Sequence, residues 1–325
     1  MEMRPLGTTG LNVSVIGFGC GAVGGLMVRG APADQERAVA RAVELGINYF
    51  DTAPAYGDGV SETNLGRVLD RLRPDVVVGT KFHAPPKGFE AAIAASLEAS
   101  LRRLGREQVD LFQLHNPVAV SGAGSVSPET VIDHVLPALE RLRTQGKFRF
   151  AGFTAVGETA SLHRVLRAGG MATAQVPFNL LNPSAGREVP RGFPGQDYAG
   201  TLTAAQAAGM GAIGIRTLAG GALSGSEARH PLGAADVDPI GSGVDYRADA
   251  RRAALFRPMA DEAGEASTAE LAIRFVISHR AVSTAMVGLA TVEQLETAAG
   301  AAGRGALSPA IMERIRGAQD GMVAA

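Results

Sequence analysis

The chain alternates short apolar runs with longer segments that carry apolar residues at helical spacing. The runs predict eight strands: residues 15–19, 49–52, 76–80, 109–115, 148–154, 173–177, 211–216 and 285–288. The longer segments predict amphipathic helices: residues 33–45, 62–72, 89–104, 128–145 and 269–278. Such alternation implies parallel strands joined by helical crossovers. Eight strands favour a closed (β/α)8 barrel, an α/β fold, over an open doubly wound sheet.

Residues at the ends of these segments agree with helix-capping chemistry. Ser127, which precedes a proline, is typical of a helix start. Gly46, Gly105 and Gly146 are typical of helix ends, because glycine adopts the left-handed conformation that a helix end requires. The alanine-rich tail from about Leu307 predicts a final helix outside the barrel.

Two segments interrupt the alternation. Residues 117–127 and about 219–248 are rich in glycine and serine, and the second is too long for a tight connection. Long excursions at the C-terminal face of a barrel often cover a site, so we expect both segments near the mouth.

Composition and charge remove several classes of protein. Thirty-one Lys and Arg residues against 32 Asp and Glu give a net charge of −1, which predicts no binding to nucleic acid or an anionic membrane. The single cysteine, Cys20, excludes an internal disulfide and a Cys-based zinc cluster. We see neither a secretion signal nor an apolar run of ~18 residues. We expect a cytoplasmic protein whose residues 1–325 form a single domain.

Polar residues gather where the predicted strands end. Asp51, Lys81 and His115 end the second, third and fourth strands, and Tyr56 follows Asp51. Each alone has a structural explanation, such as a turn cap, a packing residue or a solvated lysine. Because the strand ends of a barrel converge, we expect them to lie together. An ammonium beside a tyrosine lowers the pKa of its hydroxyl, so the set indicates proton donation to a carbonyl group.

A glycine-rich motif follows the first strand. Residues 19–24 read GxGxxG, a pattern typical of dinucleotide binding when a helix opens at the third glycine. The residues that follow are poor for helix initiation, so we interpret the segment as a flexible loop. Its glycines still allow a close backbone approach to a cofactor.

These residues carry a resemblance to the aldo-keto reductase family. The run GINYFDTAPAYG at residues 46–57, the GTK at 79–81 and the DLFQLH at 110–115 resemble its most distinctive motifs. The opening segment is similar to the family's N-terminal hairpin and first strand, and the likeness extends from about Arg4 to Glu296. It implies a (β/α)8 barrel that transfers a hydride between a nicotinamide cofactor and an aldehyde or ketone, or the corresponding alcohol or sugar hemiacetal.

The resemblance also implies roles for individual residues. Tyr56 is the general acid/base, Lys81 and Asp51 tune it, and His115 orients the substrate carbonyl. The implied cofactor contacts are Gly19, Cys20, Gly21, Asp51, Thr154, Gln175, Arg216, Leu218, Gly220, Leu223, Gly288 and Gln294. Arg216 would lie along the pyrophosphate or would instead pair with an acid on the barrel face. The family's usual Ser-Asn pair is replaced at Thr154 by Thr-Ala, which keeps a hydroxyl but loses an amide.

The predicted adenosine end departs from the family pattern. Gln294 stands where many NADP-using members place an arginine, and Glu293 would repel a phosphate that it faced. NADP(H) is the family default, and this local chemistry makes NAD(H) an alternative.

Other functions stay open at this point. One alternative is a regulatory or sensing barrel that binds nicotinamide cofactor with little turnover, and another is an aldolase that uses Lys81 as a Schiff base. Six scattered histidines give little support to a metal-dependent hydrolase. Candidate pocket residues, for a small-molecule carbonyl or alcohol substrate, are Met27, Val28, Pro117, Val118, Phe193 and Tyr198. The long insertion adds Arg229, His230, Asp245 and Tyr246.

Overall fold

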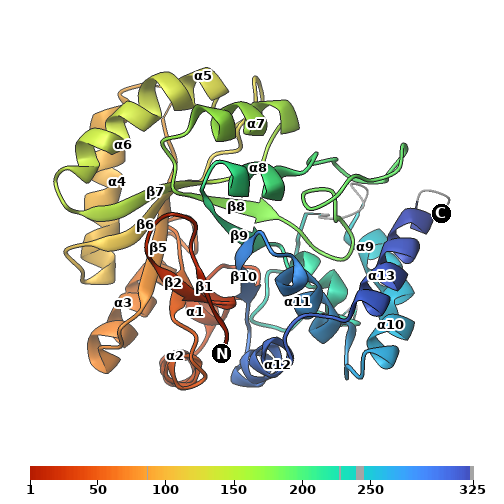
Figure 1. Cartoon of the computed structure of the whole chain (residues 1–325). Helices are drawn as coiled ribbons and strands as arrows, with labels where there is room; N and C mark the ends of the chain where they lie inside the picture. Colours follow the sequence, from red (N-terminus) through yellow and green to blue (C-terminus); the bar gives the residue numbers. More distant parts are fainter. Residues whose placement is uncertain (86, 227, 239–244, 323–325) are drawn as a thin grey trace.

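Eight parallel strands close into a barrel in the computed structural model, which describes residues 1–85, 87–226, 228–238 and 245–322 (Figure 1). The strands are β3 (Ile16–Gly19), β4 (Tyr49–Asp51), β5 (Val77–Phe82), β6 (Val109–Leu114), β7 (Phe148–Thr154), β8 (Thr173–Pro177), β9 (Gly211–Ile215) and β10 (Val282–Gly288). They pair in chain order, and β10 closes the ring against β3. The predicted (β/α)8 barrel is confirmed. Residues 227 and 239–244 of the predicted 219–248 insertion lie outside the described residues.

Helices surround the barrel, and each of the five predicted segments is helical. The helices between strands are α2 (Pro32–Glu44), α3 (Val60–Leu72), α4 (Phe89–Leu104), α6 (Leu136–Arg143), α7 (Thr159–Ala168), α8 (Thr201–Ala207) and α11 (Thr268–Ser278). After β10 come α12 (Val292–Gly303) and α13 (Pro309–Gly321). Shorter helical pieces are α1 (Leu26–Arg29), α5 (Pro128–Thr130), η1 (Val131–Val135), η2 (Ala219–Ser224), α9 (Tyr246–Ala253), η3 (Ala254–Phe256) and α10 (Arg257–Glu262).

The helix predicted at 128–145 changes its winding near its start. Ser127 caps α5 by accepting a hydrogen bond from the Thr130 backbone at 3.1 Å. The chain then forms the π-turn η1 before α6, in which Pro137 lies in the first turn. Proline has no N–H to donate, so a wider turn just before it accommodates the missing bond.

The hairpin of β1 (Met3–Pro5) and β2 (Asn12–Ser14) packs against the barrel at the end opposite the site. Leu6 and Val13 are fully buried and cluster with barrel-interior side chains, among them Tyr49 and Met286. The hairpin therefore plugs the barrel with apolar side chains and leaves its other end for polar groups.

The glycine-rich segment after β3 differs from the expected loop. It contains the one-turn helix α1, which starts after Gly25 in a left-handed conformation without a side-chain cap. Arg29 holds the turn by donating to the Leu232 and Ala22 carbonyls at 2.7 and 2.5 Å. A Cβ at Gly24 would lie 2.3 Å from the Leu289 nitrogen, so close packing on the turn after β10 requires glycine there.

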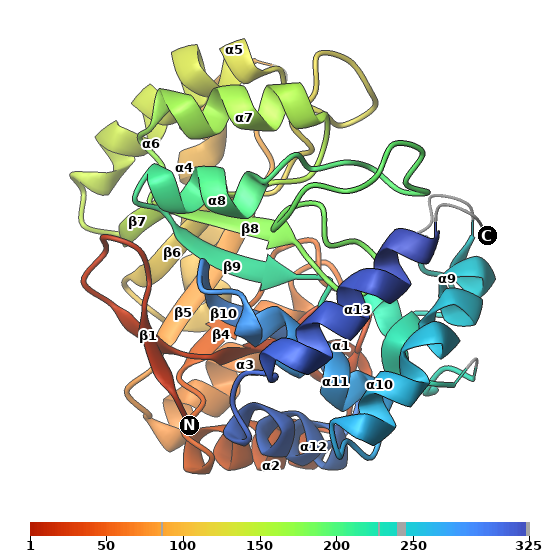
Figure 2. The ribbon, with the colours of Figure 1, turned by 45° about the vertical axis from the view of Figure 1, so that its right-hand side comes forward.

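The C-terminal segment forms α13 and confirms the predicted final helix. It lies outside the barrel across the side that carries α10 and α11 (Figure 2). Its Gln319 donates to the Leu180 carbonyl at 2.9 Å, which ties it to the segment after β8. Within the described ranges, no helix has the length and apolar character needed to cross a bilayer.

Candidate active site

The strand register brings the predicted polar residues to one end of the barrel. Asp51 at the end of β4 pairs with Gly19 of β3 on one side and with Gly79 of β5 on the other. Lys81 of β5 lies beside Gln113 of β6. Because parallel strands end on the same face, their polar side chains converge there.

Lys81 is the centre of the site. Its side chain is only 1% exposed, and its ammonium donates to the Asp51 carboxylate, to the Thr52 carbonyl at 2.9 Å and to the Tyr56 hydroxyl at 3.2 Å. An ammonium has three protons to donate, so all are used. Burial alone would lower the pKa of Lys81, but the charge of Asp51 and the contact with Tyr56 raise it to about 12.

Tyr56 is half-buried in the β4–α3 loop, where three positive-φ residues, Gly57, Asp58 and Gly59, turn the chain. Burial raises the pKa of its hydroxyl above the ordinary value of 10.0, and Lys81 opposes this shift. The expected lowering of the Tyr56 pKa therefore needs correction: the ammonium acts in the predicted direction, but burial outweighs it. The Lys81 ammonium also lies 4.8 Å from the ring centroid.

His115 completes the predicted set, and His83 joins it. The His115 ring stands edge-on to Tyr56, with centroids 5.8 Å apart and planes at 87°. Burial, with the charges of Lys81 and His83, lowers the His115 pKa to about 3, so the ring is neutral near pH 7. The exposed His83 stacks on His115 at 5.1 Å. Sequence reasoning missed this pair, because the histidines are scattered along the chain.

Two further residues that sequence reasoning missed hold Asp51 from inside the barrel. Tyr49 and Gln113, both 0% exposed, donate to its Oδ1 atom at 2.9 and 3.0 Å. Gln175 donates to the same atom at 2.8 Å through its Nε2. The Gln175 amide, expected at the cofactor, is thus engaged with the predicted catalytic carboxylate. The Thr154 hydroxyl donates to the Oε1 atom of Gln175 at 3.4 Å.

The glycines at the ends of β3 and β10 lie side by side. Gly19 pairs with Gly288, and a Cβ at Gly19 would come within 2.9 Å of the Val287 carbonyl. Cys20 is buried, and its backbone donates to the Asp51 carbonyl at 2.9 Å. Gly21 faces Tyr56, since a Cβ at Gly21 would lie 3.7 Å from the phenol ring carbon Cζ. Gly19 therefore permits close packing of β3 against β10, and Gly21 presents its backbone, without a side chain, to the Tyr56 ring.

The segment after β9 forms a tight, irregular turn. Arg216 and Ala219 have positive φ values of 59° and 48°, and Gly220 follows at 67°. Among the described residues, no hydrogen bond or ion pair holds the Arg216 guanidinium, so it does not pair with an acid on the barrel face. Thr217 lies in the same turn. Its hydroxyl is buried and has no hydrogen-bond partner among the described residues. Such turns direct backbone N–H groups toward an anion.

The other two predicted contacts of this turn are apolar. The Leu218 side chain is half-buried, whereas Leu223 is fully buried in the core, and its backbone donates to the Leu218 carbonyl at 3.2 Å. Leu223 therefore offers only its backbone to a ligand.

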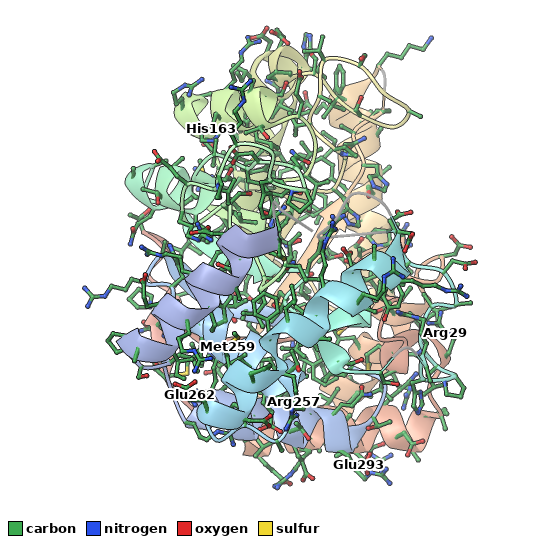
Figure 3. The ribbon with its side chains drawn as sticks, turned by 90° about the vertical axis from the view of Figure 1, so that its right-hand side faces the viewer. Arg29, His163, Arg257, Met259, Glu262 and Glu293 are labelled. Atoms are coloured by element: carbon green, nitrogen blue, oxygen red, sulfur yellow. The ribbon has the colours of Figure 1, made fainter. Side chains whose placement is uncertain are left out.

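At the start of α12, Gln294 has a structural task. Its Oε1 accepts from the Ala290 backbone at 2.8 Å, while Thr291 caps the helix by accepting from Gln294 N. Glu293 is exposed on the same turn (Figure 3). The nearby cations come from α2: Arg41 pairs with Glu296 at 2.7 Å, and Arg37 pairs with Asp34 at 3.2 Å.

The predicted pocket residues divide into two groups. Met27, Val118 and Tyr198 are buried, at 1%, 0% and 4% exposure. All three belong to the hydrophobic core and not to an open pocket wall. The half-buried or exposed members are Val28, Phe193 and Pro117. Packing of the one-turn helix α1 against the barrel accounts for the burial of Met27.

The described part of the insertion folds against itself and against the β3–α1 segment. Arg229 donates to the Gly220 carbonyl at 2.8 Å and stacks over Tyr246 at 5.1 Å. His230 accepts from the Leu232 backbone, and Asp245 caps α9 by accepting from Ala248 N at 2.6 Å. Figure 3 shows Arg29, which binds Leu232, at the edge of the molecule. These four polar residues of the insertion thus have structural contacts.

Comparison with known proteins identifies the family of this chain. The chain matches the aldo/keto reductase family over residues 15–320. It is 38% identical to L-galactose dehydrogenase of Arabidopsis thaliana over 160 residues, which are 47% of this chain and 48% of that protein. The match thus spans about half the length of that relative. Identity to L-glyceraldehyde 3-phosphate reductase of Escherichia coli K12 is 27%, over 91% of this chain and 86% of that one.

A solved structure shares the fold. The glycerol dehydrogenase of Gluconobacter oxydans superposes with a TM-score of 0.75 at 24% identity, over 98% of this chain and 94% of that one. The family match covers most of the chain, residues 15–320, and the chain folds into the closed barrel described above. The chain therefore belongs to the aldo/keto reductase family of oxidoreductases.

Proposed function

We propose that this protein reduces an aldehyde or ketone with a nicotinamide cofactor, or oxidises the corresponding alcohol or sugar hemiacetal, with Tyr56 as general acid/base. The observation that carries the proposal is the buried Asp51–Lys81–Tyr56 chain, in which one ammonium contacts both a carboxylate and a phenol. The bound cofactor supplies or accepts the hydride.

The remaining chemistry belongs to the protein's own side chains. In reduction, the Tyr56 hydroxyl donates its proton to the carbonyl oxygen, and the phenolate that forms is stabilised by Lys81 Nζ at 3.2 Å. Asp51 fixes Lys81 in position. His115 is neutral near pH 7, and its edge-on placement beside Tyr56 suits it to orient the same carbonyl oxygen. In oxidation, the Tyr56 phenolate, stabilised by Lys81, accepts the proton of the alcohol hydroxyl.

The strand ends fit the cofactor that we propose. Gly21 has no side chain to cover the Tyr56 phenol, which suits the approach of a cofactor ring, and Gly19 is a proposed backbone contact. Among the described residues, no group binds the Thr217 hydroxyl or the Arg216 guanidinium. Both are therefore suited to bind a pyrophosphate. We propose Thr154, Gln175 and Gly288 as further cofactor contacts. We propose either NADP(H) or NAD(H), since Arg37 and Arg41 of α2, which lie near the start of α12, are already paired with carboxylates.

The geometry favours this function over the two alternatives. A Schiff-base aldolase needs a neutral amine, whereas Lys81 has a pKa raised to about 12 and three occupied donors. A sensing barrel would have no use for a buried lysine that stabilises a phenolate. Borohydride should therefore trap no substrate on Lys81.

A paired titration tests the proposed cofactor. Because the chain has no tryptophan, NADPH and NADH are excited directly and their own fluorescence is followed. We expect micromolar or tighter binding of at least one, and the tighter one identifies the physiological cofactor. If neither binds in the micromolar range, the proposal is wrong.

A further inference from the structure

The two oxygens of the Asp51 carboxylate have different partners. Oδ2 accepts from the Lys81 ammonium at the mouth of the barrel. Oδ1 points into the barrel and accepts from Tyr49, Gln113 and Gln175 at 2.9, 3.0 and 2.8 Å. All of these side chains are buried, so water does not compete for these bonds.

The surrounding barrel is shaped to hold these donors. A Cβ on Gly79 of β5 would lie 2.9 Å from the Tyr49 hydroxyl and 3.2 Å from Asp51 Oδ1, so glycine is required beside the network. On the other side of Tyr49 lie Leu6, Val13 and Met286, which are apolar. Asp51 is therefore the partner that the structure provides for the Tyr49 hydroxyl. Burial and the charge of Asp51 raise the Tyr49 pKa well above 10.0, which keeps this donor protonated.

We infer that Tyr49 and Gln113 are positioning residues for the proposed reaction, because they hold Asp51 by Oδ1 so that Oδ2 fixes Lys81 against Tyr56. The inference rests on the proposed function. Gln175 shares the contact, but it is also a proposed cofactor contact, so it does not serve as a test.

The donors also moderate the charge that Tyr56 experiences. The groups that face Tyr56 are Lys81 on β5, Asp51 on β4, His115 after β6 and Cys20 after β3. Lys81 lowers the Tyr56 pKa, whereas Asp51 and Cys20 raise it. Without a donor on Oδ1, more negative charge remains on the Asp51 carboxylate. The Tyr56 pKa then rises further, and proton donation to a carbonyl becomes harder.

Two variants test this, with a third as control. Tyr49→Phe and Gln113→Met each remove one donor while keeping much of the volume. Thr173→Val removes a hydroxyl that is buried in the same interior but has no hydrogen-bond partner in the described chain. The ionisation of Tyr56 is followed by the near-ultraviolet absorbance of tyrosinate as the pH is raised. This signal is easily resolved because the chain has four tyrosines and no tryptophan. The absorbance step that disappears in Tyr56→Phe is assigned to Tyr56.

We expect that step to move to higher pH in Tyr49→Phe and Gln113→Met but not in Thr173→Val. In turnover, kcat should fall about tenfold in both variants, with KM values changed less than about twofold. The inference is overturned if Tyr49→Phe and Gln113→Met have the same Tyr56 titration midpoint and the same kcat as Thr173→Val, and lose only free energy of unfolding. The titration needs neither cofactor nor substrate, so it decides the inference even if the wild-type protein reduces no carbonyl and the proposed function fails.

Discussion

At the residue scale, opposing effects act on each titratable group of the site. Burial disfavours charge on Lys81, but Asp51 offsets this and keeps the ammonium. Burial likewise disfavours the Tyr56 phenolate, and there it is the stronger effect. Among the described residues, no carboxylate offsets burial at His115, and the nearby Lys81 and His83 add to the effect, so its ring stays neutral. The proposed proton donor thus sits between a permanent cation and a neutral ring.

The lowered His115 pKa predicts a loss of stability in acid. The unfolded chain binds a proton at His115 near pH 6.5, whereas the folded protein does so only near pH 3. Between these values the unfolded state binds more protons, so stability falls as the pH falls below about 6.5. Urea unfolding between about pH 8 and pH 5 should cost the wild type about 1–2 kcal/mol more than His115→Gln. Equal losses in both proteins would show that burial does not hold His115 neutral.

The sequence predicted those site residues that end apolar runs. Asp51 ends β4, Lys81 is the next-to-last residue of β5, and His115 directly follows β6, so each polar side chain stands out at the end of an apolar run. Tyr49 and Gln113 lie inside strands that are buried on both faces, so no alternation shows which side chains enter the barrel. Their contact with Asp51 depends on the strand register, which only the structure gives.

At the element scale, polar contacts between helices and strands support the site from behind. Glu62 on α3 is fully buried and accepts from Thr80 of β5 at 2.5 Å and from Arg103 of α4 at 2.6 Å. Thr80 directly precedes Lys81. One carboxylate therefore joins two helices to the strand that carries the central ammonium.

Removing this carboxylate should destabilise the fold. Glu62→Ala leaves the Thr80 hydroxyl and the Arg103 guanidinium without their partner, at an expected cost of about 2–4 kcal/mol in the free energy of unfolding. The control is Glu296→Ala, which breaks the exposed pair with Arg41 and should cost less than about 1 kcal/mol. Chemical denaturation measures both, and similar small losses would contradict the linking role of Glu62.

Helix prediction succeeded where periodicity extends over several turns and failed for α1. That helix has four residues, begins after Gly25 and has no side-chain cap, so neither apolar periodicity nor a capping residue predicts it. Its contacts with Leu232 and Leu289 come from segments more than 200 residues away. Tertiary packing forms this turn, and it also buries Met27, which the sequence placed at the pocket.

At the scale of the whole molecule, closure of the barrel brings its first and last strands together at the site. Gly19 from the first barrel strand lies beside Gly288 from the last. The residues that would hold the proposed cofactor include this seam and the start of α12, and the neighbouring Arg37 and Arg41 of α2 are paired with carboxylates. We therefore expect little discrimination in favour of a 2′-phosphate.

Adding a cation at this end should change the selectivity. Gln294→Arg should strengthen NADPH binding by about tenfold while NADH binding stays nearly constant, because only NADPH has the extra phosphate. Gln294→Met is the matched control, since it also loses the cap on Ala290 N but adds no charge. Equal changes for both cofactors would show that residue 294 does not face the phosphate.

The most direct test of the proposed mechanism compares binding with turnover in Tyr56→Phe. The hydroxyl is the proposed proton source, and it makes no proposed contact that holds the cofactor. Direct fluorescence titration should give a reduced-cofactor Kd within about threefold of the wild type, while the rate of carbonyl reduction falls at least about a hundredfold. Near-normal reduction by Tyr56→Phe would contradict the proposed role of Tyr56.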